Sequence, residues 1–166
     1  MEEAKERTGT GKKRVMVAIE EHECSHYALE WTLLNLKPTI SSPLLLITVQ
    51  PFSPFTYVAA ASYSSPPQEL IQSMQEHQKQ AALALLEKAK EICAKHGVDV
   101  ETITEMGEPK EVICQVAEQR NIELLVMGSH ARGAVERFFL GSVSNYCVHH
   151  AKCPVLVVKQ DSGKKN

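Results

Sequence analysis

Short apolar runs alternate along this chain with segments of helical periodicity, and this alternation is the strongest constraint on its fold. The apolar runs lie at residues 14–19, 44–49, 122–127 and 154–158. Runs of this length are typical of strands buried on both faces of a parallel sheet. Residues 98–104 alternate between apolar and polar types, which predicts a fifth strand near a sheet edge.

Between these runs, apolar residues recur every three or four positions, as on one face of a helix. The first such segment, residues 24–34, is followed by the helix stop Lys37-Pro38. A long helix is predicted over residues 68–96; the polar stretch 75–80 interrupts its apolar stripe, so we expect its first half to project from the core. Pro109 opens a further helix. The inner face of the last helix is predicted to carry Val143, Tyr146, Cys147 and His150.

The resulting order of strands and helices predicts an α/β fold: a doubly wound parallel sheet with helices on both faces. Ligands of such folds bind at the carboxyl ends of the strands, where the strand order reverses. We expect one domain over residues 14–159, with flexible tails at 1–13 and 160–166. Residues 50–67 are rich in Pro, Ser and Ala and predict a long loop.

Composition narrows the classes of partner. The net charge is −2 and aromatic residues make up 5% of the chain, which argues against a nucleic-acid surface. No apolar stretch is long enough to span a membrane, and residues 1–14 lack the apolar core of a secretory signal. The odd number of cysteines, five, predicts reduced thiols. We therefore expect a cytoplasmic protein, with the nucleus as a further location.

A glycine-containing connection follows the fourth apolar run and leads into the last helix. Gly128 directly after a buried strand allows the backbone to approach a ligand closely. Gly141-Ser142 lies where the last helix begins, and free N–H groups at a helix N-terminus bind phosphate. Ser142 and Ser144 add hydroxyls that cap the helix or contact phosphate oxygens. The alternative is a plain connection with serine as the cap.

Several motifs together carry a resemblance to a known family. They are Val15–Ile19, Ala28–Trp31, Gly107–Pro109, the segment from Met127-Gly128-Ser129-His130 to Gly141-Ser142-Val143-Ser144, and Cys153-Pro154-Val155. With them the chain resembles the universal stress protein family, in particular its plant single-domain members. The resemblance implies a five-stranded sheet of order 3-2-1-4-5. It also implies dimers formed through the last strand, and ATP or AMP bound between strands one and four, with or without Mg²⁺.

The nucleotide-binding branch of that family carries the motif Gly-x2-Gly-x9-Gly-Ser/Thr. Gly128 and the pair Gly141-Ser142 match it at the right spacing, but Ala131 replaces the middle glycine. If that position needs a positive φ, alanine costs about 1 kcal/mol. The second departure is Glu20, where nucleotide-binding members usually have Asp after the first strand.

Transferred position by position, the resemblance implies a set of nucleotide-binding residues. Those bordering the base and ribose are Ala18, Glu20, Val49, Met127 and Gly128, and those along the phosphates are His130, Ala131, Arg132, Gly141, Ser142, Val143 and Ser144. The Arg132 guanidinium is a candidate partner for phosphate, although a solvated loop arginine is an equal alternative.

The leading functional hypothesis is a nucleotide-dependent dimeric regulator in stress response. The alternatives are a chaperone-like or scaffolding dimer with weak or no nucleotide binding, favoured by Ala131, and a slow ATPase aided by His130 or Mg²⁺. No P-loop, dinucleotide fingerprint or nucleophile elbow is present in the sequence, so we predict no catalytic residues. The edge for dimerisation would be the charge-free strand Val155, Leu156, Val157 and Val158.

The remaining reactive side chains do not form a recognisable site. His22, Cys24 and His26 are spaced by two and would point to different faces of a helix, so no metal site is predicted. Cys24 near a helix start is the best candidate for a redox-sensing thiol. The alternative is a small buried hydrophobic residue.

Overall fold

The computed structural model describes residues 11–52, 67–129 and 140–160 of the chain. Five parallel strands form one sheet of order β3-β2-β1-β4-β5. The strands are β1 (Val15–Ala18), β2 (Leu44–Gln50), β3 (Val100–Met106), β4 (Leu124–Ser129) and β5 (Val155–Lys159). The predicted fold class and strand order are confirmed. The alternating pattern at 98–104 does lie in an edge strand, since β3 ends the sheet opposite β5.

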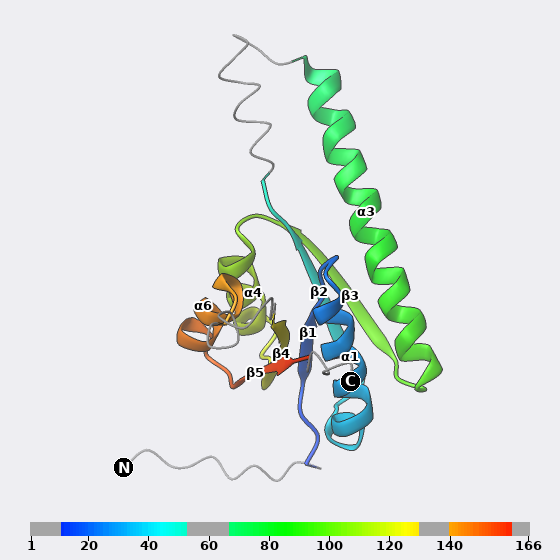
Figure 1. Cartoon of the computed structure of the whole chain (residues 1–166), viewed down its shortest axis with the longest axis vertical. Helices are drawn as coiled ribbons and strands as arrows, with labels where there is room; N and C mark the ends of the chain where they lie inside the picture. The colour runs from blue at the N-terminus through cyan, green and yellow to red at the C-terminus, as the bar shows by residue number, and fades with distance from the viewer. Residues whose placement is uncertain (1–10, 53–66, 130–139, 161–166) are drawn as a thin grey trace, which may run out of the picture.

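Two of the described helices cover each face of the sheet (Figure 1). The helices α1 (Glu23–Leu36) and α3 (Gln68–Lys95) pack on one face, against Val15, Val17 and Leu46 among others. The helices α4 (Pro109–Gln119) and α6 (Ser142–His150) pack on the other face, against Met16, Ile47 and Leu125 among others. The β1 and β2 side chains alternate between the two cores because successive residues of a strand point to opposite faces.

The long helix α3 extends beyond the sheet (Figure 1). All of its fully buried residues lie in its second half: Ala82, Leu86, Ala89 and Cys93. The expectation that the first half projects from the core is confirmed, because polar residues at 75–80 cannot replace the apolar stripe. None of the described helices is long and apolar enough to cross a membrane.

Several predicted details differ from the structure. Lys37-Pro38 does end the first helix as predicted, since α1 stops at Leu36, but an unpredicted 3-10 turn, η1 (Lys37–Thr39), follows it. The fourth strand begins at Leu124, since Asn121 adopts φ 52° and the Ile122 N–H still donates to Ala117 of α4. His150 was predicted on the inner face of α6 but is exposed and stacks on Tyr146. Ser144 is buried in its place, one turn before Cys147.

Candidate functional site

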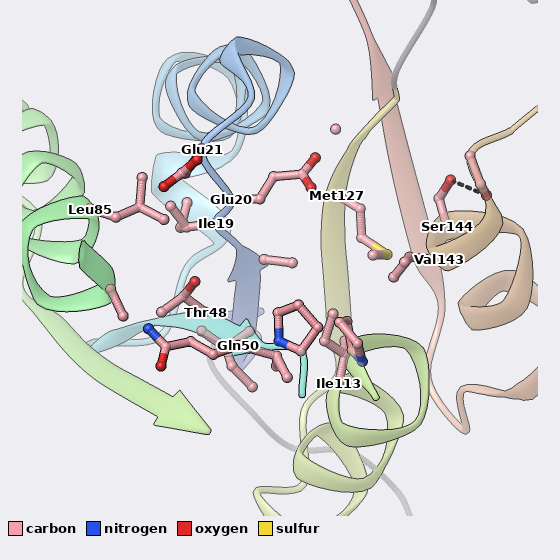
Figure 2. A pocket seen from close by; sticks show the side chains of 18 of the residues that line it. Ile19, Glu20, Glu21, Thr48, Gln50, Leu85, Ile113, Met127, Val143 and Ser144 are labelled. Carbon is pink, nitrogen blue, oxygen red and sulfur yellow. Dashed lines mark hydrogen bonds between the residues drawn. The ribbon is translucent and has the colours of Figure 1, made fainter. Parts of the chain in front are cut away.

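A cavity of about 660 Å³ opens at the carboxyl ends of β1, β2 and β4 (Figure 2). This is where the strand order reverses, between β1 and β4. The strand ends, α3, α4 and α6 each contribute to its wall. Its lining residues are Ala18, Ile19, Glu20, Glu21, Ile47, Thr48, Val49, Gln50, Pro51, Gln78, Ala81, Ala82, Leu85, Pro109, Ile113, Met127, Gly128, Gly141, Ser142, Val143 and Ser144.

The middle of the cavity is apolar. Three buried side chains face it: Ile19 from the turn after β1, Ile113 from α4 and Met127 from β4 (Figure 2). The Ile19 N–H donates to the Ile47 carbonyl at 2.7 Å, which holds the β1 exit against β2. Such a slot accepts a flat apolar or aromatic ring, while polar groups at the rim fix its orientation.

The turn after β1 brings Glu20 to the rim through contacts with the first turn of α1. The buried Ser25 hydroxyl donates to the Glu20 carbonyl at 2.8 Å and lies 3.0 Å from the His22 carbonyl. It also accepts from the Glu20 N–H at 3.1 Å. The Cys24 thiol donates to the Glu20 carboxylate at 3.4 Å. The sequence gives no sign that Ser25 has this role, because its partners come from a turn rather than from the helix.

The N-terminus of α6 forms the opposite side of the cavity. Gly141 is its N-cap residue and makes no side-chain capping bond. The Ser144 hydroxyl donates back to the Gly141 carbonyl at 3.0 Å (Figure 2), so it caps no N–H group. The first-turn N–H groups of α6 therefore have no intrahelical partner and carry partial positive charge. This arrangement suits an anionic group.

Helix α3 supplies a wall that was not predicted from the sequence. Gln78, Ala81, Ala82 and Leu85 line the cavity, and the Gln50 side chain donates to the Gln78 carbonyl. Positions 78, 82 and 85 continue the helical apolar spacing, with Gln78 as its polar member. That spacing was the only sequence signal that α3 has a buried face here. It did not indicate that this face would reach the end of β2 and line the cavity.

The described part of the cavity wall carries negatively charged side chains and no positively charged ones. Glu20 and Glu21 are the only charged side chains among its described lining residues. Any attraction for an anion within this part therefore comes from backbone N–H groups and the helix dipole, not from a lysine or arginine.

The structure gives Gly128 a second role beside the predicted one. A Cβ atom at this position would overlap the backbone of Cys24 and Ser25 in α1. The glycine is thus required by close packing of a helix against a strand. Gly128 also lines the cavity, so this packing requirement adds to the predicted proximity to a ligand.

Nine of the twelve predicted binding residues line this one cavity. They come from the ends of β1, β2 and β4 and from the start of α6: Ala18, Glu20, Val49, Met127, Gly128, Gly141, Ser142, Val143 and Ser144. The other three, His130, Ala131 and Arg132, lie outside the described residues, as do residues 53–66 of the predicted loop.

For Cys24, the structure favours the alternative of a small buried residue over a redox-sensing thiol. The thiol is buried, and burial together with the Glu20 carboxylate raises its pKa to about 12. The position near a helix N-terminus is outweighed by desolvation and a neighbouring negative charge. Within the described ranges, no group of three or more His, Cys, Asp or Glu side chains is arranged to hold a metal ion.

Comparison with known proteins places the chain in a family. The sequence model of the universal stress protein family matches residues 12–159. The chain is 33% identical over 166 residues to universal stress protein A-like protein from Arabidopsis thaliana, across 93% of this chain and 94% of that protein. The chain belongs to the universal stress protein family. A second member, universal stress protein YxiE from Bacillus subtilis, is 30% identical across 88% of this chain and 98% of its own length.

A solved structure of a universal stress protein family member agrees with this assignment. It is a protein from Arabidopsis thaliana with AMP bound, and it superposes on this chain with a TM-score of 0.67. The two are 32% identical, and the match covers 90% of this chain and 93% of that chain. The cavity of this universal stress protein lies at the switch point of a shared Rossmann-like fold.

Proposed function

We propose that this universal stress protein binds an adenine nucleotide in the cavity at the ends of β1, β2 and β4. The observation that carries the proposal is the convergence of nine predicted residues, from separate parts of the sequence, on one cavity beside a helix N-terminus. The AMP-bound relative of the same fold, at 32% identity, supports the choice of ligand.

The cavity suggests a place for each part of the nucleotide. The base lies in the apolar slot between Val49, Met127 and Ile113, where a planar ring displaces water from aliphatic surface. The Glu20 carboxylate accepts from ribose hydroxyls at the rim. The phosphate faces Gly141–Ser144 at the N-terminus of α6.

We further propose that nucleotide occupancy sets the state of a dimer that acts in stress response. Strand β5 is an edge of the sheet, and its residues 155–157 are only partly buried. An apolar edge strand pairs readily with a second copy of itself. A ligand that binds one dimer state better than the other shifts the population toward that state.

Calorimetry on protein stripped of bound nucleotide tests the binding proposal. AMP, ADP and ATP are titrated up to millimolar concentration, with adenosine as the ligand without phosphate. Saturable heat with at least one nucleotide is expected, and its absence with all three would overturn the proposal. Mass spectrometry of small molecules released on denaturation identifies the species that co-purifies.

A paired substitution tests where the base lies. Ala81→Trp places an indole in the cavity, whereas Ala84→Trp adds the same group to an exposed position of α3 that does not line it. The first variant is expected to lose roughly tenfold or more in affinity, which is about 1.4 kcal/mol, and the second to keep the native affinity. Equal affinities in both variants would show that the ligand binds elsewhere.

A second pair tests where the phosphate lies. Ser142→Asp adds a negative charge at the start of α6, which stabilises the helix but repels phosphate; Ser142→Asn has nearly the same shape without the charge. AMP binding is expected to weaken roughly tenfold only in the aspartate variant, with adenosine binding unchanged. Equal loss for AMP and adenosine would contradict the phosphate assignment.

One observation favours a second candidate, a scaffolding dimer with weak nucleotide binding. The described lining residues include two carboxylates and no basic side chain. The substitution Ala131→Gly restores the glycine of the family motif. It distinguishes the scaffolding dimer with weak nucleotide binding from the nucleotide-dependent regulator. Marked tightening of ATP binding would indicate that the native site is weakened, whereas unchanged, tight binding would favour the nucleotide-dependent regulator.

A further inference from the structure

Three thiols lie together on the face of the sheet opposite α1 and α3. Cys114 belongs to α4, Cys147 to α6, and Cys153 precedes β5. Cys147 is fully buried, while Cys114 and Cys153 are partly exposed and pack against the same core. The other two cysteines, Cys24 and Cys93, belong to the helices of the opposite face.

The Cys114 and Cys147 sulfur atoms are in direct contact. The Cys114 thiol donates to the Cys147 sulfur at 3.7 Å, and the Cys147 thiol lies 3.9 Å from the Lys110 carbonyl in the first turn of α4. This short chain of thiol contacts directs a lone pair of the Cys147 sulfur toward Cys114. Helices α4 and α6 lie side by side (Figure 1), and formation of a disulfide requires the two sulfurs to approach from 3.7 Å to about 2.05 Å.

The same two helices form part of the cavity wall. Pro109 and Ile113 face the cavity from α4, and Ile113 immediately precedes Cys114. Ser142, Val143 and Ser144 face it from α6. A covalent bond between Cys114 and Cys147 would therefore fix one part of that wall relative to the other.

We propose that Cys114 and Cys147 form a disulfide when the protein meets hydrogen peroxide, and that this bond locks α4 to α6. The partly exposed Cys114 sulfur attacks one oxygen of the peroxide; the O–O bond breaks, a sulfenic acid forms and water is released. The Cys147 sulfur then attacks the Cys114 sulfur. The S–S bond forms, the S–O bond breaks and a second water is released, so two thiols are oxidised as one peroxide is reduced.

The environment of the thiols makes this reaction slow. Burial raises the pKa of Cys114 and raises that of Cys147 to about 12, so little thiolate is present at neutral pH. The site therefore requires excess or sustained peroxide. The Cys147 sulfur is already in contact with Cys114, and this contact favours the disulfide over further oxidation of the Cys114 sulfenic acid.

The test treats fully reduced protein with a tenfold excess of hydrogen peroxide and maps the products by peptide mass spectrometry without reduction. The expected product is a peptide pair joined through Cys114 and Cys147, with the titratable thiols falling from five to three. A loop closed across 33 positions stabilises the folded state, so the melting temperature should rise by roughly 5–10 °C and return on reduction.

Single variants assign the bond. Cys114→Ala and Cys147→Ala should each abolish the crosslink and the rise in melting temperature. Cys153→Ala and the matched control Cys93→Ala should retain both. If Cys147→Ala does not fold, Cys114→Ala carries the test, because its side chain is only partly buried. A crosslink through Cys153, a bond between two chains, or conversion of Cys114 to sulfinic acid without a crosslink would each overturn the proposal.

Discussion

Gly128 at the end of β4 lies against the Cys24 backbone in the first turn of α1, with no space between them for a side chain. A Cβ atom at position 128 would fall well under 3.0 Å from the Cys24 carbonyl and also within 3.0 Å of the Ser25 N–H nitrogen. The first turn of α1 in turn holds Glu20 at the rim of the cavity. Close packing at one residue thus positions a side chain of the candidate site.

The substitution Gly128→Ala should destabilise the fold. Backbone atoms on α1 cannot move aside as a flexible side chain would, so the overlap should cost about 1–3 kcal/mol of the free energy of unfolding. Urea denaturation measures this loss. The neighbouring Ser129→Ala is the control, because the buried Ser129 hydroxyl has no hydrogen-bond partner among the described residues. Equal stability of Gly128→Ala and the native protein would contradict the packing described for this position.

Removal of the Ser25 hydroxyl should loosen the turn that carries Glu20. Ser25→Ala deletes the contacts to the Glu20 backbone and to the His22 carbonyl, at a cost of about 1–3 kcal/mol. Both the urea midpoint and AMP affinity should fall. The control Ser73→Ala changes an exposed serine on α3 and should leave both unchanged. Loss of stability with native affinity would show that the turn does not position a binding group.

Stability should decrease on acidification because of His26. Burial lowers its pKa, and Lys88 on α3 adds to this effect, while Glu30 and Glu23 oppose it. Its Nδ1 atom is buried and has no partner in the described part of the chain. When the pH drops below 6.5, the ordinary pKa of histidine, the unfolded chain binds a proton that the folded chain resists. The free energy of unfolding therefore decreases as the pH decreases.

Urea midpoints at about pH 8 and about pH 5.5 measure this dependence. In His26→Gln the decrease should be smaller than in the native protein, because the glutamine does not titrate in this range. His77→Gln, at an exposed position of α3, should keep the native dependence. An identical decrease in the native protein and in His26→Gln would exclude His26 as the cause.

The Cys24 thiol should resist alkylation in the folded protein. With its pKa raised to about 12, its thiolate fraction at pH 7.5 is roughly a thousandfold below that of an ordinary cysteine. The folded protein is labelled with iodoacetamide for the time in which the free amino acid cysteine reacts completely. Peptide mapping should then find Cys24 unmodified. The same treatment in urea should label it, and rapid labelling of the folded protein would refute the inert assignment.

A lysine in the edge strand should weaken the proposed dimer. Val157→Lys adds a charge to the outer strand of the sheet, where lysine opposes pairing with another strand. Sedimentation at micromolar concentration should give a dimer for the native protein and a monomer for this variant. Leu83→Lys, exposed on α3, should remain dimeric. A native protein of monomeric mass would contradict the dimer itself.

Local patterns were sufficient to predict the five strands and the four α-helices of the described residues. The apolar runs that become β1 and β2 are continuous because both faces of a central strand are buried, and this is visible without tertiary structure. Positions where a strand ends or a helix begins, such as Val49 and Gly141, follow from the same patterns. Because parallel strands bring such ends together at one edge, the nine predicted residues that the structure describes meet in one cavity.

Contacts between separate elements were not predictable in this way. The sequence by itself determined the alternation of strands and helices, since periodicity and helix boundaries depend on neighbouring residues. Only the tertiary structure decided that Gln78 and Ala81 wall the cavity, that burial raises the pKa of Cys24, and that Cys114 contacts Cys147. The physical reason is that burial and contact depend on how the crossovers place helices over the sheet, and no short stretch of sequence encodes that placement.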